Sequence, residues 1–188
     1  METSSQVEVL EAQIRECYGR VVWTHKTHEK CTDILNDRNN TIKMWQIILS
    51  AVTTSGIFIT VLGKSEAAGI VSAIISMLTL ALTTYVKEYD LGGMAQKHAD
   101  AASSIWNVRE KYLSLLTDIR AGVVGVDEIR TIREKLQDDL HKLYKGSPRT
   151  LTKAYYKASE ALKKMEEMTF SDEEIDKFLP KSLKKSRE

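Results

Sequence analysis

The sequence is poor in residues that interrupt helices. Its 188 residues include only two prolines and nine glycines, whereas Leu, Ala, Glu and Lys are plentiful. These four residues favour helices, and the alternation of polar and apolar residues that is typical of a strand is absent. We therefore expect an all-α protein.

The chain also lacks an excess of charge of either sign. Its 27 Lys and Arg residues and 26 Asp and Glu residues leave a net charge of +1. The basic residues are spread along the chain, whereas a nucleic-acid surface needs a concentrated positive patch. We expect no nucleic-acid partner.

Residue patterns that catalysis or metal binding requires are missing as well. The two cysteines and four histidines have no spacing that matches a zinc site. Adjacent carboxylates such as Asp138 and Asp139 do not share a helical face, and the glycines at 122 and 125 lack the following Lys-Ser/Thr of a phosphate loop. We expect no enzyme activity, no catalytic residue, no metal and no cofactor.

Two adjacent stretches contain no ionisable side chain. Residues 44–63 and 67–86 are twenty residues each, about the length that crosses ~30 Å of hydrocarbon. Residues 64–66 are predicted to form an extracytoplasmic turn, so the two stretches form an antiparallel transmembrane hairpin with membrane lipid as a partner. The alternative is a pair of buried helices in a soluble bundle, but the amphipathic flanking segments do not supply the large apolar shell it needs.

Basic residues indicate the orientation of this hairpin. The turn contains a single lysine, whereas the open end is flanked by Lys26, Lys30, Arg38, Lys43, Lys87 and Lys97. Lys and Arg are enriched on the cytoplasmic side of membrane proteins. We therefore predict a multi-pass protein with both termini in the cytoplasm.

Apolar and small residues recur in steps of four and three on both sides of the hairpin. Residues 1–43 and 87–120 are therefore predicted to form an antiparallel coiled-coil stalk in the cytoplasm. Folding the chain at the turn places Cys31 opposite His98. Residues 121–188 are predicted to form additional packed cytoplasmic helices and a basic tail.

The same register places small and polar residues of the two spans opposite each other. Small residues let membrane helices approach closely, and hydroxyls or amides hydrogen-bond across them for about 1 kcal/mol each. We interpret this polar seam as hairpin packing, with a channel lining as the alternative; two helices cannot enclose a water path, so a pore would need several copies. The seam residues are Gln46, Ser50, Thr53, Thr60, Gly69, Ser72, Ser76, Thr79 and Thr83.

Paired glycines follow the second span. Gly92 and Gly93 interrupt the predicted returning helix just below the bilayer. Paired glycines at such a position form either a tolerated kink or a hinge. Both residues are hinge candidates.

Three further segments carry a resemblance to a known family. They are KHADAASSIWNVREKYLSLLTDIRAG at 97–122, SPRTLTKAYYKASEAL at 147–162 and FSDEEIDKFLP at 170–180. Together with the paired spans, they make nearly the whole chain resemble the SLATT family, two-transmembrane effectors of bacterial conflict systems, and particularly its reverse-transcriptase-associated subgroup. The stretch 112–118 and the terminal SDEEID-x-FLP are the most specific parts.

The resemblance implies a function that the periodicities do not. It implies an inner-membrane effector of antiviral defence that oligomerises and permeabilises the membrane when an associated cytosolic sensor or nucleotide-producing enzyme detects infection. It assigns no catalytic or ligand-contact residue. The alternative is a passive membrane anchor or scaffold that recruits a soluble partner through its helical stalk.

Overall fold

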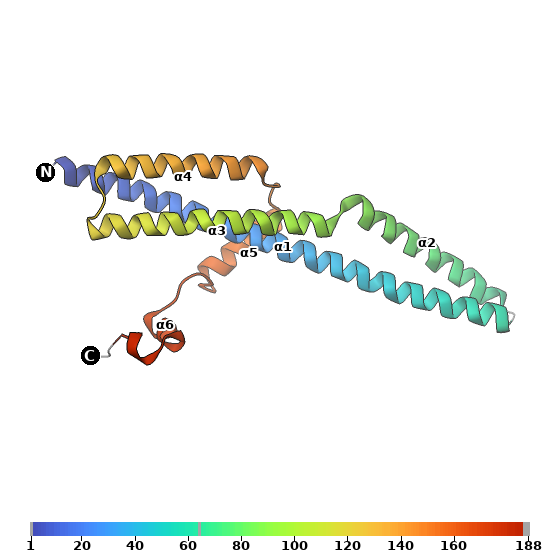
Figure 1. Cartoon of the computed structure of the whole chain (residues 1–188). Helices are drawn as coiled ribbons and strands as arrows, with labels where there is room; N and C mark the ends of the chain where they lie inside the picture. The colour runs from blue at the N-terminus through green and yellow to red at the C-terminus, as the bar shows by residue number, and fades with distance from the viewer. Residues whose placement is uncertain (1, 64, 186–188) are drawn as a thin grey trace.

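The computed structural model describes residues 2–63 and 65–185. Lys64 of the predicted turn and residues 186–188 of the predicted tail lie outside the described residues. The described chain contains helices and no strand, which confirms the all-α prediction (Figure 1). The elements are α1 (Glu2–Gly63), α2 (Glu66–Tyr89), α3 (Leu91–Ala121), α4 (Val126–Gly146), α5 (Thr152–Lys163), α6 (Asp172–Phe178) and the 3-10 helix η1 (Lys181–Leu183).

One helix runs the length of the molecule. α1 contains 62 residues, which extend about 90 Å at the helical rise. It begins near the N-terminus and continues without a break into the first apolar stretch, because no proline interrupts it (Figure 1). The predicted N-terminal stalk helix and the predicted first span are thus one continuous helix.

The returning chain is broken once, at Asp90. This residue has a φ of 36°, ends α2 and begins α3, and its side chain accepts a hydrogen bond from the Gly93 backbone N–H at 3.0 Å. Gly92 and Gly93 therefore lie in the first turn of α3. A Cβ added to Gly93 would overlap the Asp90 carboxylate, so glycine at position 93 is what allows this cap to form.

A compact bundle forms at the end opposite the α1–α2 turn. We use "the bundle" for residues 2–43 of α1 together with α3, α4 and α5. α4 and α5 lie on different sides of the α1–α3 pair (Figure 1), and α5 buries three alanines against α1: Ala154, Ala158 and Ala161. The main core lies between α1, α3 and α4 and consists of Leu10, Ile14, Val21, Ile105, Val108, Tyr112, Leu115, Ile119, Ile129 and Leu136.

The contact of His98 with α1 lies within one helical turn of the predicted position. His98 was expected opposite Cys31, but it contacts His28, three residues earlier in α1. In contrast, Gln46 contacts Thr83 within the apolar stretches, as predicted. The returning chain leaves the helical path at Asp90, between these two contacts.

Candidate functional site

The outer surface of the apolar hairpin, residues 44–86, is strongly hydrophobic. Ile47, Leu62 and Met77 have 71%, 79% and 72% of their surface exposed. Both helices are long and apolar enough to cross a membrane, and almost none of the apolar stretch is buried within the chain. A core helix of a soluble bundle would be covered by other helices, and large exposed apolar patches mark contact with a membrane or a partner.

The two helices of the hairpin approach closely where small residues meet. Ser72 is the buried residue of α2, and a Cβ added to Gly56 would overlap its hydroxyl. Nearer the turn, a Cβ added to Gly69 would lie 3.2 Å from Cγ2 of Thr60. At the open end, the Gln46 side-chain N–H donates to the Thr83 hydroxyl at 3.2 Å. Close packing and one polar contact thus join the helices, as is usual in membranes.

The predicted seam residues do not all lie between the helices. Ser72 is buried. Five are half-buried at the contact between α1 and α2: Gln46, Thr53, Thr60, Gly69 and Thr79. Three are exposed: Ser50, Ser76 and Thr83. Gly56, which is not among the predicted seam residues, lies against Ser72.

Most hydroxyl groups in the hairpin bond to their own helix. Thr53 donates to the Leu49 carbonyl at 2.9 Å, Thr60 to the Gly56 carbonyl at 2.8 Å and Thr79 to the Ile75 carbonyl at 2.9 Å. Such bonds to the preceding turn satisfy the hydroxyl donor without water. The seam is therefore compatible with close packing in hydrocarbon.

Aromatic and basic side chains join the helices at the open end of the hairpin. The Arg38 guanidinium donates to the Tyr85 hydroxyl at 2.5 Å and lies 5.5 Å from the centre of its ring. The ring of Tyr85 is 4.5 Å from that of Tyr89. Trp45 is half exposed at the same end. This composition is typical of a membrane–water interface, and it lies just before the break at Asp90.

Three buried histidines lie below this junction, in the interface between α1 and α3. Burial and the neighbouring His98 lower the pKa of His28 to about 4, and burial lowers the pKa of His98. Burial also lowers the pKa of His25, against the opposing effect of Glu29. All three rings are therefore neutral at pH 7. Of these three histidines, only His98 was assigned a partner by the predicted stalk register, which placed it opposite Cys31.

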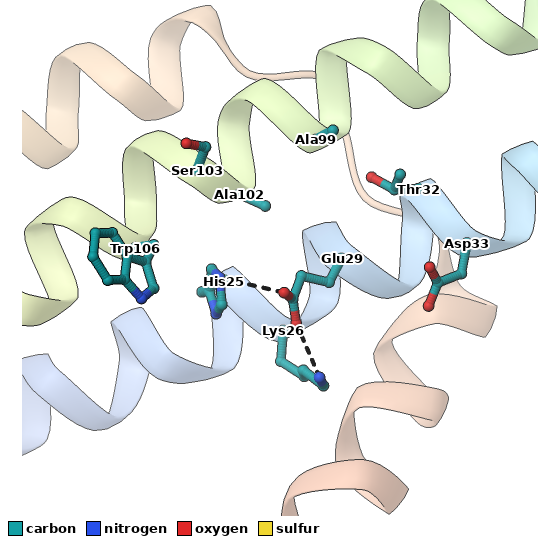
Figure 2. Close-up of a pocket in the computed structure, with 9 residues that line it drawn as sticks. All are labelled: His25, Lys26, Glu29, Thr32, Asp33, Ala99, Ala102, Ser103 and Trp106. Carbon is teal, nitrogen blue, oxygen red and sulfur yellow. Dashed lines mark hydrogen bonds and ion pairs between the residues drawn. The ribbon is translucent and has the colours of Figure 1, made fainter. Parts of the chain in front are cut away.

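A pocket of about 530 Å³ opens between α1 and α3 beside these histidines. In Figure 2, the His25 ring lies between Trp106 and Glu29, and its Nε2 is 3.7 Å from the Glu29 carboxylate. The pocket is lined by His25, Lys26, Glu29, Thr32, Asp33, Ala99, Ala102, Ser103 and Trp106. Among the described residues, no three His, Cys, Asp or Glu side chains are placed to hold a metal ion.

Comparison with known proteins gives one match. The family model described as SMODS and SLOG-associating 2TM effector domain family 4 matches residues 10–174. No curated protein and no solved structure matches the chain. The matched range contains the whole apolar hairpin and nearly all of the bundle.

Proposed function

Because the chain belongs to the SLATT family of SMODS and SLOG-associating two-transmembrane effector domains, we propose that it permeabilises the bacterial inner membrane when activated. The family and the two apolar helices together indicate a membrane effector of a conflict system. Several copies would associate, and their hairpins would form the permeable structure.

The distribution of polar groups on the apolar hairpin carries this proposal. Ser50 and Ser76 are exposed on the hairpin, and neither hydroxyl forms a hydrogen bond with another described residue, whereas the exposed Thr83 already bonds to the Thr79 carbonyl and to Gln46. Lipid offers hydroxyl groups no hydrogen-bond partners, whereas neighbouring helices and water do. A single hairpin encloses no water path, so association of several copies would give these groups partners and allow a path to form.

The break at Asp90 supports a conformational change in the hairpin. α1 enters the hairpin as a continuous helix, whereas α2 is separated from α3 by one non-helical residue. We propose that Gly92 and Gly93, next to that residue, belong to a hinge. A movement of α3 in the bundle would then change the position of α2 relative to α1.

We also propose an orientation and a partner. Residues 1–43 and 87–188 would lie in the cytoplasm, residues 44–63 and 67–86 would span the inner membrane, and residues 64–66 would form the outer turn. In this orientation the bundle is accessible to a cytosolic sensor or nucleotide-producing enzyme encoded nearby, including a reverse-transcriptase-associated system as the sequence resemblance implies.

The test uses the full-length chain expressed with its genomic neighbours. After triggering, we expect loss of membrane potential and entry of a normally excluded dye. Ser50→Leu combined with Ser76→Leu should abolish both signals while partner recruitment persists. Ser55→Leu is the matched control, because Ser55 is exposed and donates to the Ala51 carbonyl, about 140° around the helix from Ser50.

The outcomes separate the effector from a passive anchor. An anchor would recruit its partner while the membrane stays polarised in triggered, growth-arrested cells, and that result would rule out the proposal. Equal loss of dye entry in the control variant would show that any serine replacement disturbs the hairpin and that the exposed pair has no special role.

A further inference from the structure

The pocket between α1 and α3 is long and narrow. His28 is opposite His98, and the Thr32 hydroxyl contacts the Ala95 carbonyl. This alignment places Trp106 and Asp33 at opposite ends of the pocket, with their backbone positions about 20 Å apart along the helix axes at the helical rise. Figure 2 shows this arrangement. A volume of about 530 Å³ spread over that length leaves room for one extended chain, with the small side chains of Ala99 and Ala102 lining it.

The lining is richer in free hydrogen-bond acceptors than in free donors. Lys26 is its one Lys or Arg residue, and its ammonium is held by Glu29 at 2.9 Å and by Glu167, from the segment after α5, at 2.6 Å. The Asp33 carboxylate forms no ion pair with any described residue. The positive charge of the lining is thus neutralised, while a carboxylate remains free.

A buried acceptor lies in the wall of this pocket. His25 is only 6% exposed, and its Nδ1 has no hydrogen-bond partner among the residues that the structure describes. Because Nε2 faces the Glu29 carboxylate, the proton of the neutral ring belongs on Nε2, which leaves Nδ1 as an acceptor. Nδ1 is itself covered by the protein, so it does not contact a ligand directly, and the neutral ring adds no positive charge to the pocket wall.

At the end of the pocket opposite Asp33, an exposed aromatic ring can contact a cation. Trp106 is 48% exposed, and the Arg109 guanidinium carbon lies 6.0 Å from the centre of its ring. Tryptophan is the aromatic residue that attracts ammonium and guanidinium groups most strongly. Arg109 is itself paired with the Glu110 carboxylate at 2.6 Å, which offsets its repulsion of a second cation at the exposed part of the ring.

From these features we propose that the pocket binds a linear polyamine. Its ammonium groups would contact Asp33 at one end and Trp106 at the other, and its hydrocarbon segments would lie over Ala99 and Ala102. A nucleotide of similar length is disfavoured, because the Asp33 carboxylate, which forms no ion pair with a described residue, would repel its phosphates. Binding would connect α1 to α3, and it is independent of the membrane activity proposed above.

Calorimetric titration of spermidine into the full-length protein, in an uncharged detergent, tests the proposal. We expect saturable binding that Asp33→Asn weakens about tenfold, as loss of one charged hydrogen bond predicts. Asp37→Asn is the matched control, since it removes the same charge from an exposed residue one turn further along α1, outside the pocket. The control should bind spermidine like the unmodified chain.

Parallel titrations with MgCl₂ and ATP identify other ligand chemistries. Equal weakening by both Asn variants would indicate a diffuse ion atmosphere and would overturn the proposal. Displacement of spermidine by Mg²⁺ at matched ionic strength, saturable binding of ATP in its place, or no binding of spermidine would overturn it too. Circular dichroism melts of both variants establish that each is folded.

Discussion

The Nδ1 atoms of His28 and His98 lie 3.0 Å apart in the buried interface between α1 and α3. Two nitrogens at this distance share one proton, so one ring donates and the other accepts. The ring centres are 5.0 Å apart, and neither side chain has appreciable contact with solvent. Adding a proton to this neutral pair would place a buried positive charge in the interface.

Acidification should therefore destabilise the bundle. Unfolded histidines titrate near pH 6.5, whereas His28 in the folded protein has a pKa of about 4. The unfolded state binds more protons between these values, so stability is unaffected by these groups above pH ~6.5 and falls as the pH is lowered toward 4. We expect a loss of about 2 kcal/mol, or roughly 5 °C in melting temperature.

Melting followed by circular dichroism from pH 7.5 to 4.5 measures this loss. His28→Gln should flatten the pH dependence, while the exposed His141→Gln should leave it unchanged. Because carboxylates titrate in part of the same range, the difference between the two variants is the quantity of interest. Identical profiles would disprove a role for the histidine pair.

Gly56 should be sensitive to the smallest enlargement. In Gly56→Ala the new methyl group would overlap the Ser72 hydroxyl, so we expect a loss of about 1–3 kcal/mol from overpacking. The matched change Gly63→Ala meets only the side chain of Ile59, in its own helix, at 3.9 Å and should be neutral. Thermal unfolding in detergent compares the two; equal stability would mean that the helices are not in close contact at Gly56.

The two adjacent glycines of α3 should respond differently to the same substitution. Gly93→Ala would displace the Asp90 carboxylate from its cap, with an expected loss of about 1 kcal/mol. Gly92→Ala would make only an ordinary contact with Asn39 at 3.6 Å. Hydrogen exchange of residues 86–95 should accelerate in the first variant alone. Acceleration in both would indicate that the break depends on backbone flexibility in general.

The segment after α5 should be released when its ion pair is removed. Glu167 bonds to Lys26 at 2.6 Å and to Lys30 at 3.3 Å, and the hydrogen bond from Lys26 lowers the pKa of Glu167. Glu167→Gln should increase trypsin cleavage after Lys164 severalfold, because partly buried ion pairs hold such segments in place. The neighbouring Glu166→Gln, which removes no ion pair, should cleave like the unmodified protein.

Features that depend on composition over a whole segment could be predicted from the sequence. The all-α fold and the two apolar helices follow from the scarcity of proline and from the two charge-free stretches, which need no knowledge of the packing. The contact of Gln46 with Thr83 followed from the position of the turn alone. The membrane boundaries and the hinge role of Gly92 and Gly93 stay predictions.

Features that depend on a single residue's conformation could not be predicted. Asp90 adopts a positive φ of 36°, which is uncommon for residues other than glycine, and no pattern distinguishes it from the glycines at 92 and 93. The contact between Glu167 and Lys26 depends on the path of an irregular segment, for which no periodicity exists.

The continuity of α1 has a mechanical consequence. Because α1 has no break, a lateral force on its end in the bundle would also turn the half that lies in the apolar hairpin. α2 and α3 are separated at Asp90, so a force on α3 would turn α2 less. A force on the bundle would therefore displace α1 along α2, and Gly56 and Ser72, which are in close contact, would have to move past each other.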